Sequence, residues 1–217
     1  MKKADDLFYD LENFRTPSEM EEYFLNKRNI IDADKEYSDF ARLKKGLFKK
    51  FIEEFYPLYC FSQSRYCKAD SQMKIVLGNQ GYDAIIQDSS GTENQYEITS
   101  YIDGKFEYED AIRMNESGIG DIRFKDILDL DSRSLNYLSV VLKNYKKKSE
   151  KDYTGVNIIM IVNTFPYFEV YNNNSRAFVD LLIAKMSEIN IKANKGYLMI
   201  FNDRDIKSIN ENIYEVK

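Results

Sequence analysis

The stretch from Met73 to Tyr101 constrains the fold most, because it has the pattern of three short β-strands. The first, Met73–Leu77, is apolar apart from one lysine, and the four residues after it have the composition of a turn. The second predicted strand is Tyr82–Gln87, and a loop rich in serine and glycine connects it to the third, Gln95–Thr99. The sequence therefore predicts a three-stranded antiparallel meander.

Two carboxylates in this meander are predicted to share one face of the sheet. Side chains alternate between the two faces of a strand, so pairing of Gln87 with Gln95 makes Asp83 and Glu97 diagonal neighbours, about 7–8 Å apart at the backbone. Carboxylate oxygens are the ligands that hard cations such as Mg²⁺ prefer. We therefore predict Asp83 and Glu97 as ligands of Mg²⁺ or Mn²⁺.

These residues resemble the PD-(D/E)xK nuclease superfamily, which has the restriction-endonuclease-like fold. The resemblance rests on Gly81-Tyr82-Asp83, the hairpin, and Glu97-Ile98-Thr99. It implies that Asp83 and Glu97 bind a metal ion. It also implies a lysine two residues after the second carboxylate, which helps to activate water, but Thr99 stands at that position.

Lys74 is a candidate to replace the missing motif lysine. If Leu77 pairs with Tyr82 across the turn, Lys74 falls opposite Ile85, which in turn falls opposite Glu97. Lys74 and Glu97 would then lie about 10 Å apart at the backbone, on the face that carries Asp83. The alternative interpretation is an edge-strand lysine that prevents aggregation.

The order of predicted elements gives the fold class. Apolar residues at helical spacing, capping residues and apolar runs predict helices at residues 16–29, 35–56, 131–148 and 176–189, and strands at residues 156–162 and 197–201. Together with the meander this is an α/β fold with an α-β-β-β-α-β core of the restriction-endonuclease-like type, in which helices flank a central mixed sheet. We expect a single domain over residues 1–217, with its core at about 36–201 and an N-terminal helical extension at 1–35. Residues 103–131 are expected to be an excursion from the core, with a helix over Tyr108–Asn115.

Composition limits the chemistry that this chain of 217 residues can perform. It has no histidine, which excludes Ser-His-Asp and Cys-His catalysis and histidine-ligated metals. The net charge is −5, whereas a protein that mainly coats nucleic acid would be basic. The sequence has no apolar run as long as a membrane span and no signal peptide at its start, so we expect a cytoplasmic protein without a membrane partner.

Further charged and aromatic residues each have a functional and a structural interpretation. Glu53 and Glu54 could add a carboxylate to the site or form a solvated helix face. Basic residues near the end of the helix at 131–148 could contact phosphates or stabilise the helix dipole: Lys143, Lys146, Lys147, Lys148 and Lys151. The seventeen tyrosines and fourteen phenylalanines could stack on bases, although a core without tryptophan needs most of them.

Two hypotheses of function follow. The first is a Mg²⁺-dependent hydrolase of phosphodiester bonds in which Asp83 and Glu97 bind the metal and Thr99 and Lys74 complete the catalytic set. The second is an inactive nuclease-fold module that binds a protein or nucleic-acid partner. Thr99 and the acidic charge favour the second, and the two carboxylates on one face favour the first.

Overall fold

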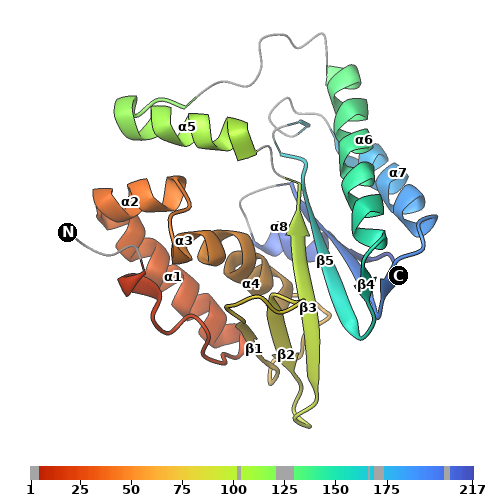
Figure 1. Ribbon diagram of the computed structural model, residues 1–217, viewed down its shortest axis with the longest axis horizontal. Helices are drawn as coiled ribbons and strands as arrows, with labels where there is room; N and C mark the ends of the chain where they lie inside the picture. The colour runs from red at the N-terminus through yellow and green to blue at the C-terminus, as the bar shows by residue number, and fades with distance from the viewer. Residues whose placement is uncertain (1–4, 102–103, 121–129, 166, 169–173, 203–205) are drawn as a thin grey trace. The chain divides into compact units, whose positions relative to one another are not determined.

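The computed structural model describes residues 5–101, 104–120, 130–165, 167–168, 174–202 and 206–217 (Figure 1). The chain divides into two compact units. The first unit comprises Met1–Asn79, Asp83–Glu93 and Ile102–Arg123, and the second comprises Gln80–Tyr82, Asn94–Tyr101 and Phe124–Lys217. The expectation of one domain over residues 1–217 stays a prediction.

The first unit holds the N-terminal helices, an antiparallel hairpin and one later helix. Its elements are η1 (Asp6–Phe8), α1 (Pro17–Ala33), α2 (Lys35–Arg42), α3 (Leu47–Lys50), η2 (Phe51–Phe55), α4 (Tyr56–Ser62), β1 (Gln72–Ile75), β2 (Ala84–Gln87) and α5 (Gly104–Ser117). Helix α5 confirms and extends the helix that we expected at Tyr108–Asn115.

Helix α1 begins at the predicted capping box. The Thr16 side chain accepts a hydrogen bond from the Glu19 amide, and the Glu19 carboxylate accepts one from the Thr16 amide at 2.7 Å. The helix ends at Ala33, later than the predicted residue 29, because Asp34 then caps α2 by accepting bonds from the amides of Glu36 and Tyr37.

The prediction of one continuous helix over residues 35–56 is wrong in the middle of that range. The helix is interrupted between α2 and α3, where Lys44 and Gly46 have positive φ angles of 49° and 54°. The Asp5 carboxylate accepts a hydrogen bond from the Leu47 amide at 2.7 Å, and a Cβ on Gly46 would lie 2.2 Å from an Asp5 oxygen. A distant residue therefore fixes this break, which the local apolar spacing does not reveal.

The helix predicted to end at residue 56, just before Pro57, continues through this proline. Pro57 occupies the first turn of α4, which continues to Ser62. The preceding segment η2 is a π-helical turn in which the Tyr56 amide bonds to the Phe51 carbonyl. This wider turn accommodates a proline, which has no amide proton and would clash with the carbonyl of a regular helix.

Strands β1 and β2 form the predicted hairpin in the predicted register. Lys74 pairs with Ile85, and Met73 pairs with Ile86. Met73 and Ile75 are fully buried, together with aromatic residues of the helices such as Phe48 and Phe55. Alternation along β1 therefore separates the core side chains of the first unit from Lys74.

The second unit contains a mixed sheet with strand order β3-β5-β7-β8. Strands β3, β5 and β7 are parallel, and β8 is antiparallel to β7. The elements are β3 (Glu93–Ser100), α6 (Leu130–Ser149), β4 (Asp152–Tyr153), β5 (Val156–Asn163), α7 (Arg176–Ser187), β6 (Lys192–Ala193), β7 (Gly196–Phe201), α8 (Ile206–Glu211) and β8 (Ile213–Glu215). The last helix and strand were not predicted, because their segments are short and largely polar.

The core of the second unit lies between the sheet and helices α6 and α7. Residues of both helices pack with alternate residues of β5, such as Ile158 and Met160. Strand β5 is buried at seven successive positions, Val156–Val162, as its apolar run predicted. The apolar spacing of the helix predicted at residues 131–148 includes Leu135, but its side chain is 63% exposed, whereas Tyr137 is buried.

These elements confirm the expected α/β class with a mixed sheet and flanking helices. Within the described part of the chain, no helix has the length and apolar character that a membrane crossing requires.

Candidate functional site

Asp83 lies in the first unit, one residue before β2. Its backbone carbonyl accepts a hydrogen bond from the Val76 amide at 2.8 Å, which extends the β1–β2 register by one pair. The side chain is half-buried. The hairpin thus holds the backbone of the first predicted metal ligand in place, opposite Val76.

Glu54, on the π-helical turn η2, is a carboxylate near Asp83 within the same unit. Burial raises the pKa of Glu54 to about 7, and the negative charge of Asp83 adds to this increase. A hydrogen bond from Lys50 acts in the opposite direction but does not compensate for the burial. Among the residues that the structure describes, Glu54 Oε2 is buried without a hydrogen-bond partner.

Glu97, the other predicted ligand, lies on β3 in the second unit. Its Oε1 accepts a hydrogen bond from Lys148 Nζ at 2.6 Å and one from the Tyr153 hydroxyl at 3.3 Å. The Glu97 side chain is 16% exposed and that of Lys148 is 25% exposed, so solvent screens this ion pair only in part. Since Asp83 and Glu97 belong to different units, their proximity stays a prediction.

The ion pair changes the proton affinity of its partners. Burial lowers the pKa of Lys148, but the hydrogen bond and the charge of Glu97 outweigh this effect and raise it. Burial also raises the pKa of the Tyr153 hydroxyl, and the negative charge of Glu97 raises it further. Lys148 therefore stays an ammonium group and Tyr153 a hydrogen-bond donor at neutral pH.

The other two predicted catalytic residues, Lys74 and Thr99, lie on β1 and β3. The Lys74 ammonium lies 4.6 Å from the centre of the Phe14 ring, within the first unit. Thr99 is half-buried and pairs with Met160 of β5 in the parallel register. The catalytic roles of both residues stay predictions, while Lys148 is the lysine that contacts Glu97 in the described structure.

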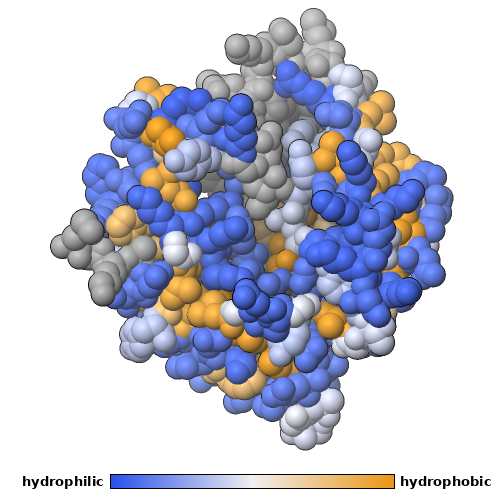
Figure 2. Space-filling view, in the orientation of Figure 1, coloured by the Kyte–Doolittle hydropathy of each residue, from blue (hydrophilic) through white to orange (hydrophobic). Residues whose placement is uncertain are grey.

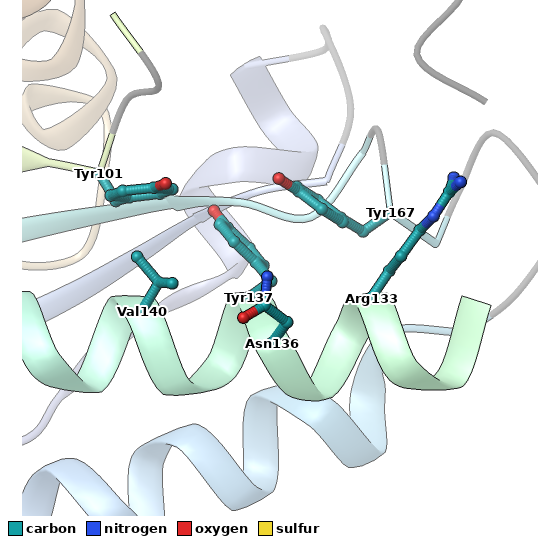
Figure 3. Close-up of a pocket in the computed structure, with 6 residues that line it drawn as sticks. All are labelled: Tyr101, Arg133, Asn136, Tyr137, Val140 and Tyr167. Carbon is teal, nitrogen blue, oxygen red and sulfur yellow. The ribbon is translucent and has the colours of Figure 1, made fainter. Parts of the chain in front are cut away.

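A pocket of aromatic character lies in the second unit, at the N-terminal half of α6 (Figure 3). It has a volume of about 100 Å³ and is lined by Tyr101, Arg133, Asn136, Tyr137, Val140 and Tyr167. The Tyr137 and Tyr167 rings are stacked with their centres 4.1 Å apart, and Tyr101 lies 6.0 Å from Tyr137. The buried Tyr137 is fixed by its hydroxyl, which accepts a hydrogen bond from the Asn163 amide at 3.1 Å.

Tyr101 and Tyr167 reach this pocket because β3 and β5 are parallel. Tyr101 directly follows β3, and Tyr167 follows β5 by four residues. The carboxyl ends of parallel strands meet at the same edge of a sheet, which is where open α/β sheets commonly bind ligands.

A larger pocket in the first unit, about 390 Å³, surrounds a group of charges that neutralise one another. Asp10 forms ion pairs with Arg15 at 3.4 Å and Lys27 at 3.5 Å, and it accepts a hydrogen bond from Tyr23. The Arg15 backbone also pairs with that of Met73 through bonds of 2.9 and 2.8 Å. We interpret this network as an anchor that fastens the N-terminal segment to β1.

Two further sequence candidates have structural partners. Glu53 is paired with Lys44, whose ammonium also contacts Glu107 of α5 at 2.6 Å. Lys143, Lys146 and Lys147 are exposed on α6, whereas Lys148 is partly buried against Glu97.

No group of three or more Asp, Glu, Cys or His side chains is placed to hold a metal ion within the described ranges. Mg²⁺ usually keeps several waters and binds proteins through one or two carboxylates. The pair formed by Glu54 and Asp83 has the chemistry for such a hydrated ion.

Comparisons with protein-family models, curated proteins and solved structures found no significant match to this chain. The sequence did not reveal the Lys148–Glu97 pair, because these residues are 51 positions apart and Lys148 is one of several lysines. The tyrosine pocket was equally hidden, since its rings come from three separate segments.

Proposed function

We propose that this chain is a Mg²⁺-dependent nuclease with a restriction-endonuclease-like core. The single observation that carries the proposal is the buried carboxylate of Glu54 within reach of the negative charge of Asp83. Burial and a like charge keep the pKa of Glu54 near 7, and its Oε2 is buried without a hydrogen-bond partner in the described structure. A divalent cation would neutralise both carboxylates and occupy that oxygen.

In this proposal Asp83 and Glu54 hold a hydrated Mg²⁺. When bound between these carboxylates, the ion would supply a water of lowered pKa for attack on a phosphodiester bond. Glu97 joins the same ion if the strand parity of the meander is as predicted. The family resemblance implies a nucleic-acid substrate.

Lys148 and Tyr153 have a positioning role in this scheme. The Lys148 ammonium, 2.6 Å from Glu97, holds the second carboxylate in an ion pair and provides the positive charge that Thr99 lacks. The Tyr153 hydroxyl fixes the same oxygen from a second direction. Because charge-assisted hydrogen bonds are strong and short, this arrangement holds Glu97 in one orientation.

The test is cleavage of plasmid DNA, single-stranded DNA and RNA, with Mg²⁺ or Mn²⁺ and with EDTA. Asp83→Asn and Glu97→Gln should each abolish metal-dependent cleavage. Glu93→Gln, which changes an exposed carboxylate at the start of the same strand β3, should cleave like the wild type. Calorimetric titration with Mn²⁺ should show binding to the wild type and not to Asp83→Asn.

Cleavage that survives in Asp83→Asn would contradict the proposal, because a contaminant or another site would then be responsible. Absence of cleavage by the wild type on all three substrates would contradict it as well. The outcome would then favour the second hypothesis, an inactive binding module. One observation favours that alternative: Glu97 already forms an ion pair with Lys148.

A further inference from the structure

The pocket in Figure 3 has the size and lining of a site for one flat ring. Its volume of about 100 Å³ is well below that of typical pockets for drug-sized ligands, which are about 300–1,000 Å³. Tyr101 and Tyr167 are half-exposed, and the buried Tyr137 supports them from below. A ring that enters here meets aromatic faces, which every nucleobase can stack on.

The polar residues of the pocket suit a nucleotide better than a purely apolar ring. Asn136 is exposed and carries both a donor and an acceptor, which can bond to the edge of a base. Arg133 extends from α6 beside Tyr167, where its guanidinium can bind a phosphate through two bonds (Figure 3).

The pocket is continuous with a basic stripe along α6. Arg133, Asn136, Val140, Lys143 and Lys147 follow one another at spacings of three or four residues and therefore lie on one face of the helix. Lys143 and Lys147 are exposed, and Figure 2 shows a hydrophilic surface over the C-terminal half of α6. The stripe ends next to Lys148, which holds Glu97.

We propose that this pocket binds one unstacked base of a single-stranded nucleic acid, whose backbone follows α6 over Lys143 and Lys147 toward Glu97. Lys147 follows Arg133 by 14 positions, which is about 21 Å along the helix at 1.5 Å per residue. The inference rests on the proposed function, because that proposal names nucleic acid as the ligand. It adds that the substrate is single-stranded.

Fluorescence anisotropy with labelled oligonucleotides in EDTA tests the inference without cleavage. Tyr167→Ala should weaken binding of single-stranded DNA or RNA by about 5- to 150-fold, the range for loss of one base–aromatic stack. Tyr167→Phe keeps the ring and should bind like the wild type. Tyr9→Ala, at a tyrosine that is 86% exposed in the first unit, is the control for loss of any surface tyrosine.

A second measurement identifies the contact as a base. The fluorescence of a single 2-aminopurine in an oligonucleotide should be quenched when the wild type or Tyr167→Phe binds, but not when Tyr167→Ala binds. The double change Lys143→Gln with Lys147→Gln should reduce the slope of log K against log salt by about 1.4, at about 0.7 per phosphate contact. Lys146→Gln, off the stripe on the same helix, should reduce it by less.

Equal affinity of Tyr167→Ala and wild type for single strands would overturn the inference. So would a wild type that binds duplex DNA as tightly as single strands. Separate DNA and RNA arms show which sugar the site accepts. A protein that binds single strands through this pocket but never cleaves them would contradict the proposed function while supporting the inference. If the wild type cleaves nucleic acid but Tyr167→Ala binds single strands as tightly as the wild type, the proposed function is supported and the inference is contradicted.

Discussion

The sharpest quantitative prediction concerns Glu54→Gln and the pH dependence of folding. In the native protein the pKa of Glu54 is about 7, compared with 4.5 for an unperturbed glutamate. A carboxyl group with a raised native pKa stabilises the fold fully below its unfolded pKa. This contribution is lost as the pH rises toward the native value, because the unfolded chain ionises first.

The two pKa values give the magnitude. Between about pH 5 and about pH 8, ionisation of Glu54 should remove about 2–3 kcal/mol of unfolding free energy from the wild type. For a chain of this length, that corresponds to a fall in melting temperature of about 5–10 °C. Glu54→Gln cannot ionise, so its unfolding free energy should fall less over the same range, and the variant should be the more stable protein at about pH 8.

Urea unfolding of the wild type and Glu54→Gln at several pH values measures this difference directly. Glu53→Gln, which changes the neighbouring carboxylate paired with Lys44, shows whether loss of any carboxylate from this helix has the same effect. Equal pH slopes for Glu54→Gln and wild type would refute the reasoning. If Glu54 and Asp83 bind a divalent cation, Mn²⁺ at about pH 8 should also raise the melting temperature of the wild type more than that of Glu54→Gln.

Two further predictions concern single contacts. Lys148→Met leaves Glu97 partly buried without its cation, so it should lower the unfolding free energy by about 1–3 kcal/mol. An unchanged unfolding free energy in urea titrations would argue against a stabilising role of this ion pair. Gly46→Ala should lower the melting temperature by several degrees, since Gly46 has a φ of 54° and a Cβ would lie 2.2 Å from Asp5 Oδ1. Asp5→Ala removes both the clash and the bond to the Leu47 amide. In calorimetry it should therefore lower the melting temperature less in the Gly46→Ala background than in the wild type, and equal losses would show that the backbone strain alone is responsible.

Local patterns in the sequence determined most of the secondary structure. The Thr16 capping box, the hairpin at Lys74 and Ile85, and the apolar run Val156–Val162 are all present as predicted. These features depend on contacts between residues close in sequence or on burial of one whole face of an element. Both causes leave a regular pattern of residue types in the sequence. The α/β class follows from the order of these elements.

Tertiary contacts decided where the local patterns failed. The break at Gly46 depends on Asp5, some 40 residues earlier, and the passage through Pro57 depends on a π-helical turn. Leu135 and Tyr137 are both apolar candidates on α6, and only packing against β5 and α7 selects the tyrosine for the core.

The candidate site shows the same division. The sequence by itself nominated Asp83 and Glu97 through strand parity, which is a local property. The tertiary structure supplied Lys148 as the partner of Glu97, Glu54 as the neighbour of Asp83, and the pocket of Tyr101, Tyr137 and Tyr167. A charge pair or a ring pocket joins residues far apart in the chain and leaves no periodic pattern, so only the packing of helices on the sheet brings them together.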